Sequence, residues 1–234
     1  MLTSIIIPYY NHWDLTHSIL LQLQQRVHGN YNIVLVNDGS TDTDCTTGVS
    51  WWQSWLQHTI YYYHNPENIG FGGSMNIGAK LAIKHGADIL VMLSNDVTIY
   101  CNFIEPLERI ISSNPTALIG AELIDYDGGW NAFDINGRHY VIPYLNGWFL
   151  ACTPEVWQKT GGFDSIYGKY TYEDIDLSTN IINLGYNLVV LQDCPMRHTG
   201  GGTVSHSNPD RIKITEENRQ KYYEKWKDII PRIF

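Results

Sequence analysis

Short apolar runs alternate with helix-like segments through the first half of the chain, and this alternation constrains the fold more than any other feature. The runs are rich in β-branched or aromatic residues and are too short for typical helices, so they predict strands. They lie at residues 4–9, 32–37, 59–64 and 88–94. Apolar residues at helical spacing fill the gaps between them. Because this alternation is typical of right-handed crossovers between parallel strands, we expect an α/β fold with a mostly parallel central sheet flanked by helices.

The second half is less regular but contains recognisable element boundaries. Helices are predicted at 103–113 and 173–184, and strands at 117–124 and 187–191. Thr153 followed by Pro154 is typical of a helix N-cap and first helical residue, and Gly161 marks the end of that helix. Residues 126–144, rich in Gly, Asn and Asp, favour loops or a small hairpin. No internal repeat or linker is evident, so a single domain is expected over residues 1–234.

Composition narrows the class of protein and of partner. With 44% hydrophobic and 17% charged residues over 234 positions, the chain is typical of a globular domain. Its formal net charge of −9 disfavours duplex nucleic acid as a partner. The sequence has no apolar run long enough to span a bilayer, so we expect a cytoplasmic protein. The cysteines lack metal-ligand spacing and are expected to be reduced thiols; they are Cys45, Cys101, Cys152 and Cys194.

Residues 206–234 combine basic with aromatic side chains, among them Tyr222, Tyr223 and Trp226. The pattern favours a C-terminal helix that packs on the domain. Peripheral association of this tail with a membrane surface is the alternative.

Polar side chains follow each of the first four predicted strands. Asn11, Asp38, Asn68 and Asp96 stand at or just beyond the strand ends. Turn chemistry alone could explain any one of them. Ligands of open parallel sheets, however, bind outside the carboxyl ends of the strands, where these positions converge. The joint pattern therefore predicts a ligand site at that edge of the sheet.

A series of short motifs carries a resemblance to a known family. In chain order they are SIIIPYYN at 4–11, VNDGSTD at 36–42, NIGFGGSMN at 68–76, ND at 95–96, GGFD at 161–164, YEDIDL at 172–177 and His198. In this order and spacing they resemble the inverting glycosyltransferases of family 2, which have the GT-A fold, a Rossmann-like arrangement. The likeness runs from Ser4 to about Thr203 and is closest to the rhamnosyltransferase-like branch, whose members decorate bacterial surface polysaccharides.

The resemblance implies a nucleotide-sugar-binding half at 1–97, an acceptor and catalytic half at 98–205, and a helical tail at 206–234. It implies a UDP- or dTDP-linked donor, with Asp38 accepting a hydrogen bond from the N–H of uracil or thymine. An acceptor-only carboxylate suits that role. The other nucleotide-sugar-binding residues that the resemblance implies are Pro8, Tyr10, Asn68, Gly72, Gly73, Asn76, Asn95 and Asp96.

The resemblance also implies a divalent cation, Mn²⁺ or Mg²⁺, bound by Asp96 and His198. Such a cation stabilises the charge that develops on a departing diphosphate. Many members of the family carry Asp-x-Asp at this strand end, whereas this chain has Ser94-Asn95-Asp96. Ser94 cannot add the second negative charge. Either the metal is therefore held more weakly, or the missing carboxylate mainly served the ribose; metal dependence is expected.

Asp174 is the expected catalytic base, and Glu173 is expected to orient the acceptor or the loop. Transfer with inversion in a single displacement needs a carboxylate that takes the proton of the attacking hydroxyl. On local grounds alone, the same pair could simply complement the dipole at the start of a helix. Trp148 and Tyr172 are the expected sugar-stacking residues of the acceptor site, with a place in the core as the alternative for Trp148. The implied enzyme is a hexosyltransferase-type protein of polysaccharide biosynthesis, acting on a glycan or glycoconjugate.

Three other functions remain open at this point. A sugar-phosphate nucleotidyltransferase would be expected to carry a basic, Gly-rich segment near the first strand, but the first Lys or Arg is Arg26. A non-catalytic carbohydrate-binding relative would be favoured by loss of Asp96 or Asp174, and both are present. A transferase acting on DNA bases would need a basic groove on an acidic protein. Acceptor choice is expected to lie in residues 126–148 and 199–208.

Overall fold

A seven-stranded sheet forms the centre of the molecule in the computed structural model, which describes residues 1–41, 44–192, 196–199 and 209–234. The strand order is β12-β6-β11-β4-β1-β2-β3. The strands are β1 (Thr3–Tyr9), β2 (Tyr31–Asn37), β3 (Ile60–His64), β4 (Ile89–Leu93), β6 (Leu118–Gly120), β11 (Phe149–Cys152) and β12 (Leu188–Val190). Within this sheet β11 runs antiparallel to both of its neighbours, and the other pairings are parallel. The expected mostly parallel α/β sheet is confirmed.

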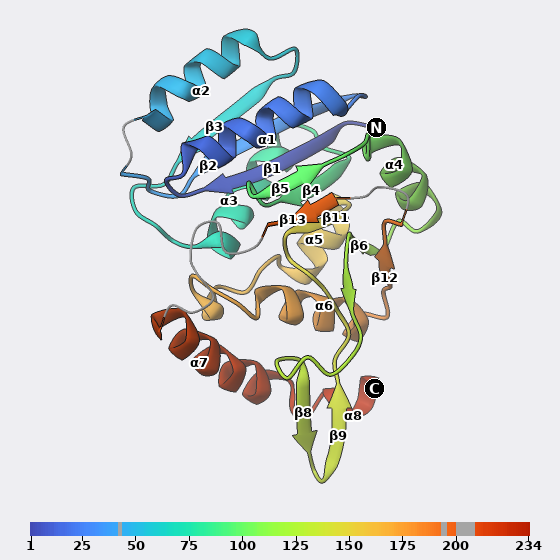
Figure 1. The fold of residues 1–234 in the computed structure, drawn as a ribbon. Coiled ribbons are helices and arrows are strands. Elements are labelled where there is room, and N and C mark those ends of the chain that lie inside the picture. Colours follow the sequence, from blue (N-terminus) through green and yellow to red (C-terminus); the bar gives the residue numbers. More distant parts are fainter. Residues whose placement is uncertain (42–43, 193–195, 200–208) are drawn as a thin grey trace.

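Helices cover both faces of the sheet because its central strands are apolar on both sides. Ile5 and Ile7 of β1 pack into the core under α1 (Trp13–Arg26), α2 (Asp44–Trp55) and α4 (Ile104–Ser113). Ile6, between them, points to the opposite face. There it packs under α3 (Phe71–Lys84), α5 (Pro154–Thr160) and α6 (Glu173–Asn183). Figure 1 shows the resulting three layers, with α1 and α2 on one side of the sheet and α3, α5 and α6 on the other.

The capping residues identified in the sequence correctly predicted both ends of α5. The Thr153 hydroxyl accepts a hydrogen bond from the Val156 N–H at the start of α5, and Gly161 ends that helix with φ of 80°. The expected strand at 117–124 is divided into β6 and β7 (Leu123–Ile124), because β7 pairs with β10 (Tyr144–Leu145) outside the main sheet. Residues 126–144 contain the hairpin of β8 (Ala132–Ile135) and β9 (Arg138–Val141).

The C-terminal tail folds back against α6. It forms α7 (Pro209–Trp226) and α8 (Ile230–Ile233), which pack with the β8–β9 hairpin around a third apolar cluster. Tyr222 and Trp226 lie in that cluster, so the predicted packed helix is confirmed. In the described part of the chain, no helix combines the length and apolar character needed to cross a bilayer.

Among the cysteines, Cys152 in β11 is a buried free thiol. The side chain of Cys45 and the whole of Cys194 lie outside the described residues, as does nearly all of the predicted acceptor segment 199–208.

Candidate active site

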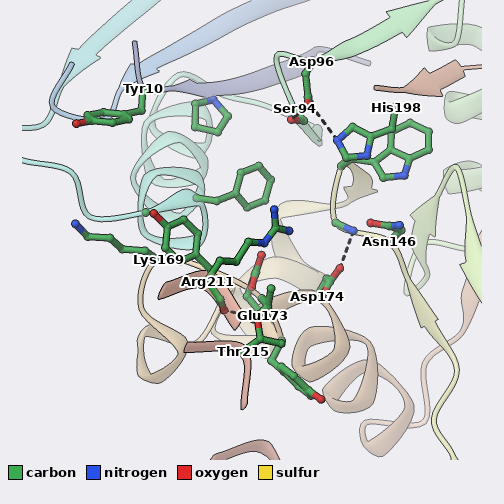
Figure 2. A pocket seen from close by; sticks show the side chains of 18 of the residues that line it. Tyr10, Ser94, Asp96, Asn146, Lys169, Glu173, Asp174, His198, Arg211 and Thr215 are labelled. Carbon is green, nitrogen blue, oxygen red and sulfur yellow. Dashed lines mark hydrogen bonds and ion pairs between the residues drawn. The ribbon is translucent and has the colours of Figure 1, made fainter. Parts of the chain in front are cut away.

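A cavity of about 640 Å³ opens at the carboxyl ends of β1, β2 and β4. Both halves of the chain contribute to its walls (Figure 2). The predicted site residues that it brings together are Pro8, Tyr10, Asp38, Asn68, Asn95, Asp96, Trp148, Tyr172, Glu173, Asp174 and His198. We call the wall formed by residues 8–96 with His198 the donor wall, and the wall formed by residues 130–175 and 211–215 the base wall.

Asp38 organises the donor wall through its buried carboxylate. Its Oδ1 accepts hydrogen bonds from the Asn65 side chain and the Ile69 N–H, both at 2.9 Å. Its Oδ2 accepts from the Gly70 N–H at 2.9 Å. The carboxylate therefore holds the loop that joins β3 to α3, a role that sequence reasoning did not assign to it. Three of its roughly four acceptor positions are used, which leaves about one for a ligand.

Gly70 is required by the closeness of the two walls. It adopts φ of 90°, and a Cβ there would lie 2.4 Å from the Cα of Lys169. Only glycine meets both conditions without strain.

Gly73 and Asn76 do not line the cavity, contrary to expectation. A Cβ at Gly73 would touch the side chain of Ile69 at 3.1 Å. The Asn76 side chain donates to the Phe163 carbonyl at 2.7 Å and accepts from the Phe163 N–H at 3.0 Å. Gly72 likewise packs on Phe163. Gly72 and Asn76 therefore fasten α3 to the segment after α5, whereas Gly73 packs on the loop before α3.

Asp96 and His198 meet on the donor wall although they are far apart in the sequence. The short strands β5 (Val97–Ile99) and β13 (Met196–His198) pair antiparallel and bring the Asp96 Oδ1 within 3.0 Å of the His198 Nε2. The Ser94 hydroxyl donates to the same Oδ1 at 2.5 Å. The two candidate ligands therefore lie in direct contact with each other at the cavity. Asn95 instead turns its side-chain amide toward the Thr16 hydroxyl, 3.1 Å away.

One carboxylate and one imidazole suit a divalent cation such as Mn²⁺. Among the described residues, no group of three or more His, Cys, Asp or Glu side chains is arranged to hold a metal. A cation bound by Asp96 and His198 would therefore take further ligands from substrate oxygens or water.

Glu173 and Asp174 are the first two residues of α6 and lie half-buried in the base wall. The Asp174 Oδ2 accepts from the Gly147 N–H at 3.0 Å, and its Oδ1 accepts from the Ile175 N–H at 2.9 Å. Burial raises the pKa of Asp174, although these backbone donors oppose the shift. Burial and then the neighbouring Asp174 charge raise the pKa of Glu173 to about 8, against the opposing effect of Arg211. The pair therefore retains a proton near neutral pH.

The two expected sugar-stacking rings are largely committed to packing. The Trp148 indole stacks on His198, with ring centroids 5.6 Å apart, and donates to Glu122 at 3.1 Å. Tyr172 is only 2% exposed, and its hydroxyl donates to the Trp130 carbonyl at 2.6 Å. Its ring packs against other buried tyrosines, so it cannot offer a face to a sugar. Trp130 lines the same cavity and is 50% exposed, which makes it the better-placed stacking surface.

Several cavity residues were missed by sequence reasoning. Arg211, Ile212 and Thr215 come from α7, and Lys169 comes from the loop before α6. Figure 2 shows the Arg211 side chain pointing into the cavity between the Glu173–Asp174 pair and the Asp96–His198 pair. The basic character of the tail was the available signal, but it pointed equally to a membrane surface. Arg211 reaches the cavity because α7 packs back against α6, and the sequence gives no sign of that contact.

Comparison with known sequences identifies one family and distant relatives. The sequence model of the family described as Glycosyl transferase family 2 matches residues 4–170. An uncharacterized glycosyltransferase of Rickettsia typhi is 30% identical over 192 residues, which cover 75% of this chain and 57% of that protein.

Comparison with solved structures supports the same fold. The chain is similar to GalNAc-T7 in complex with UDP, GalNAc and Mn²⁺, with a TM-score of 0.71 and 16% identity over 95% of this chain and 50% of that one. It is also similar to the mannosyltransferase PcManGT of Pyrobaculum calidifontis in complex with GDP-Man and Mn²⁺, with a TM-score of 0.61 and 18% identity over 82% of this chain and 55% of that one. The chain thus spans about half the length of these neighbours, and the likeness is one of GT-A-type fold.

Proposed function

Because the chain belongs to glycosyl transferase family 2, we propose that it transfers one sugar from a UDP- or dTDP-linked donor to a hydroxyl group of a glycan or glycoconjugate, with inversion in a single displacement. The observation that carries this proposal is the single cavity that holds a donor wall, with Asp38 and the Asp96–His198 pair, opposite a base wall with Glu173 and Asp174. The cavity volume of about 640 Å³ falls in the range that small-molecule ligands occupy.

The nucleoside would lie on Pro8 and Tyr10, beside Asp38. The remaining acceptor position of the Asp38 carboxylate suits the imide N–H of a pyrimidine, while its three internal hydrogen bonds keep the pocket edge in place. GalNAc-T7 was solved with UDP and PcManGT with GDP-Man, so the fold accommodates different bases. The resemblance to the rhamnosyltransferase-like branch remains a prediction of the subfamily, and the donor is proposed as UDP- or dTDP-linked.

The diphosphate would lie between the two walls. Asp96 and His198 would hold Mn²⁺ or Mg²⁺, which supplies positive charge to stabilise the leaving diphosphate. Both structural neighbours were solved with Mn²⁺. Arg211 and Lys169 add positive charge to a cavity that otherwise contains several carboxylates. These cations would share with the metal the stabilisation of the negative charge on the leaving diphosphate.

Asp174 would act as the base. As the acceptor oxygen forms its bond to the anomeric carbon, the hydroxyl proton passes to the Asp174 carboxylate. The bond from the anomeric carbon to the diphosphate breaks, and its electron pair leaves with the phosphate oxygen. The N–H groups of Gly147 and Ile175 fix the direction of the carboxylate, and its raised pKa makes it a stronger base than an exposed aspartate. Glu173, with a pKa of about 8, carries a proton at neutral pH and can donate a hydrogen bond to the acceptor.

A thermal-shift screen of nucleoside diphosphates, with and without Mn²⁺, tests the donor half of this proposal. At 100 times its dissociation constant, the preferred ligand stabilises the fold by about 2.7 kcal/mol. We expect UDP or dTDP to stabilise more than ADP or GDP. Equal or greater stabilisation by ADP would remove the case for Asp38 as a pyrimidine reader.

A further inference from the structure

Helix α7 lies outside the segment that matches the family, yet it is fastened to the part of the base wall that carries the proposed base. Its buried residues are Thr215, Asn218, Tyr222 and Trp226, which form one helical stripe. Each of them makes a hydrogen bond to α6 or to the loop before it. The stripe therefore joins α7 to α6 and to the loop before it by hydrogen bonds as well as by apolar packing.

Asn218 is the residue of this stripe whose buried side chain contacts the most backbone carbonyls. It is fully buried, and its side-chain amide nitrogen faces the carbonyl oxygens of Tyr167, Tyr170 and Thr171 at 2.7, 2.5 and 3.2 Å. Its Oδ1 accepts from the Lys221 ammonium group at 2.9 Å. One amide group thus gathers three carbonyls of a single loop, about 50 residues away in the chain.

The loop that Asn218 contacts contains two residues with unfavourable backbone dihedral angles. Thr171 and Tyr172 adopt φ of 58° and 73°, in the left-handed region that non-glycine residues rarely occupy, and Thr171 is β-branched. Tyr172 is also the N-cap of α6 and provides no side-chain cap. Such a conformation persists only when surrounding contacts hold it. Glu173 and Asp174 follow immediately in the sequence, so the backbone conformation at Thr171 and Tyr172 determines the positions of both carboxylates.

The other bonds of the stripe anchor α7 itself. The Tyr222 hydroxyl lies 2.6 Å from the Thr179 hydroxyl, and the Trp226 indole donates to buried Asp176 at 2.7 Å. Both partners are on α6, beyond the proposed base. These contacts fix α7 to the body of α6, which leaves Asn218 in place to hold the loop.

We propose that Asn218 is the positioning residue for the Glu173–Asp174 pair, and that it acts by holding residues 167–172 in the conformation that places the Asp174 carboxylate toward the acceptor hydroxyl. This inference rests on the proposed function. An apolar residue would fill the same volume but would remove the two N–H donors that these three carbonyls share. The loop would then relax toward ordinary backbone angles and move the start of α6. A displacement of about 1 Å in a reacting group can lower a rate by about 100-fold.

Asn218→Ala tests the inference, with Asn180→Ala as its matched control. Asn180 is on α6 itself, and its amide also donates to a backbone carbonyl, that of Thr160 at the end of α5, 3.0 Å away and apart from residues 167–172. Three quantities are measured on each variant of the whole 234-residue chain. Hydrogen exchange of the peptide over residues 167–176 reports on the loop, and kcat for transfer, beside the affinity for the preferred nucleoside diphosphate, reports on function.

For Asn218→Ala we expect faster exchange in that peptide and a fall in kcat of roughly 10–100-fold, with nucleoside diphosphate affinity changed by less than about threefold. Asn180→Ala should leave all three quantities near wild type. Asn218→Asp keeps the shape but lacks the donor, so in its folded fraction it should lose at least as much activity. Unchanged exchange, or faster exchange with unchanged kcat, would overturn the inference. Absence of transfer by the wild type with every donor that binds would instead overturn the proposed function, and the catalytic part of this inference with it.

Discussion

The two walls of the cavity treat their carboxylates differently. On the donor wall, Asp38 receives three N–H donors, and Asp96 is paired with His198 and Ser94. On the base wall, Glu173 and Asp174 lie side by side at a helix start, and burial raises the pKa of both. Local hydrogen bonds thus stabilise charge on the donor wall. On the base wall, burial outweighs the two backbone N–H donors of Asp174, so charge there is held at a cost to folding.

This difference matches the chemistry that each wall would perform. A donor wall must keep a fixed shape around a nucleotide, and satisfied carboxylates serve that purpose. A general base needs a pKa near the working pH, which requires an environment that disfavours its charge. Substitutions on the base wall should therefore affect rate more than folding, and substitutions on the donor wall should affect binding and folding together.

Asp174→Asn should give the largest effect. The amide keeps the shape of the side chain but cannot take a proton at neutral pH, so transfer should fall by about 10²–10⁴-fold with little change in donor affinity. Steady-state kinetics and nucleoside diphosphate titration separate the two quantities. Glu173→Gln should be milder and act more through acceptor binding. The comparison breaks if Asp174→Asn retains its rate while Glu173→Gln is inactive, because the base would then be Glu173.

Asp96→Ala should give the next largest effect, on the donor wall. Removing the carboxylate from the Asp96–His198 pair should lower turnover and donor affinity together, by roughly 10–100-fold, as loss of groups that support metal sites commonly does. Excess chelator should reproduce the defect in the wild type. Full wild-type activity in chelator, measured after metal-free dialysis, would show that this wall works without a cation and that Asp96 has another role.

Asp38→Asn should have a smaller and mixed effect. Whichever way the amide is turned, its NH₂ group faces an N–H that Asp38 now accepts. The loop over residues 65–70 should loosen, at a cost of about 1–3 kcal/mol in unfolding free energy, with donor affinity down about tenfold. Denaturant unfolding and nucleotide titration measure both. Loss of affinity at unchanged stability would mean that Asp38 contacts the base and does not support the loop.

Glu173→Gln should give the smallest effect, on stability and only over part of the pH range. The folded-state pKa of Glu173 is raised from 4.5 to about 8, so between these values the folded protein holds a proton that the unfolded chain releases. Wild-type stability should therefore be highest below about pH 4.5 with respect to this group, and should fall as pH rises through 8. The variant should lack this fall and melt a few degrees higher at pH 8. A parallel pH dependence of Tm in both proteins would contradict the raised pKa.

The same contrast explains how far the sequence could be interpreted. The donor wall follows the ends of consecutive strands, so Pro8, Asp38 and Asp96 could be placed at one edge of the sheet from strand patterns alone. The base wall depends on contacts between distant segments. Nothing local indicates that Arg211 enters the cavity or that Asn218 binds the loop before α6, because both depend on the path of α7.

The direction in which a side chain points was the second property that the sequence could not predict. Asn76 and Tyr172 belong to motifs that were correctly located, yet the first turns to Phe163 and the second into the third apolar cluster. Motif position fixes the backbone segment, while the neighbours in the fold decide which face of it reaches the ligand.

The anomeric configuration of the first product tests the central claim most directly. The protein is incubated with each nucleotide sugar that binds, and the released or transferred sugar is followed by NMR before mutarotation, beside release of the nucleoside diphosphate. Single displacement, with Asp174 as base, predicts release of nucleoside diphosphate together with a product of inverted configuration, and loss of both in Asp174→Asn. A product of retained configuration, or no cleavage of any donor that binds, would contradict it.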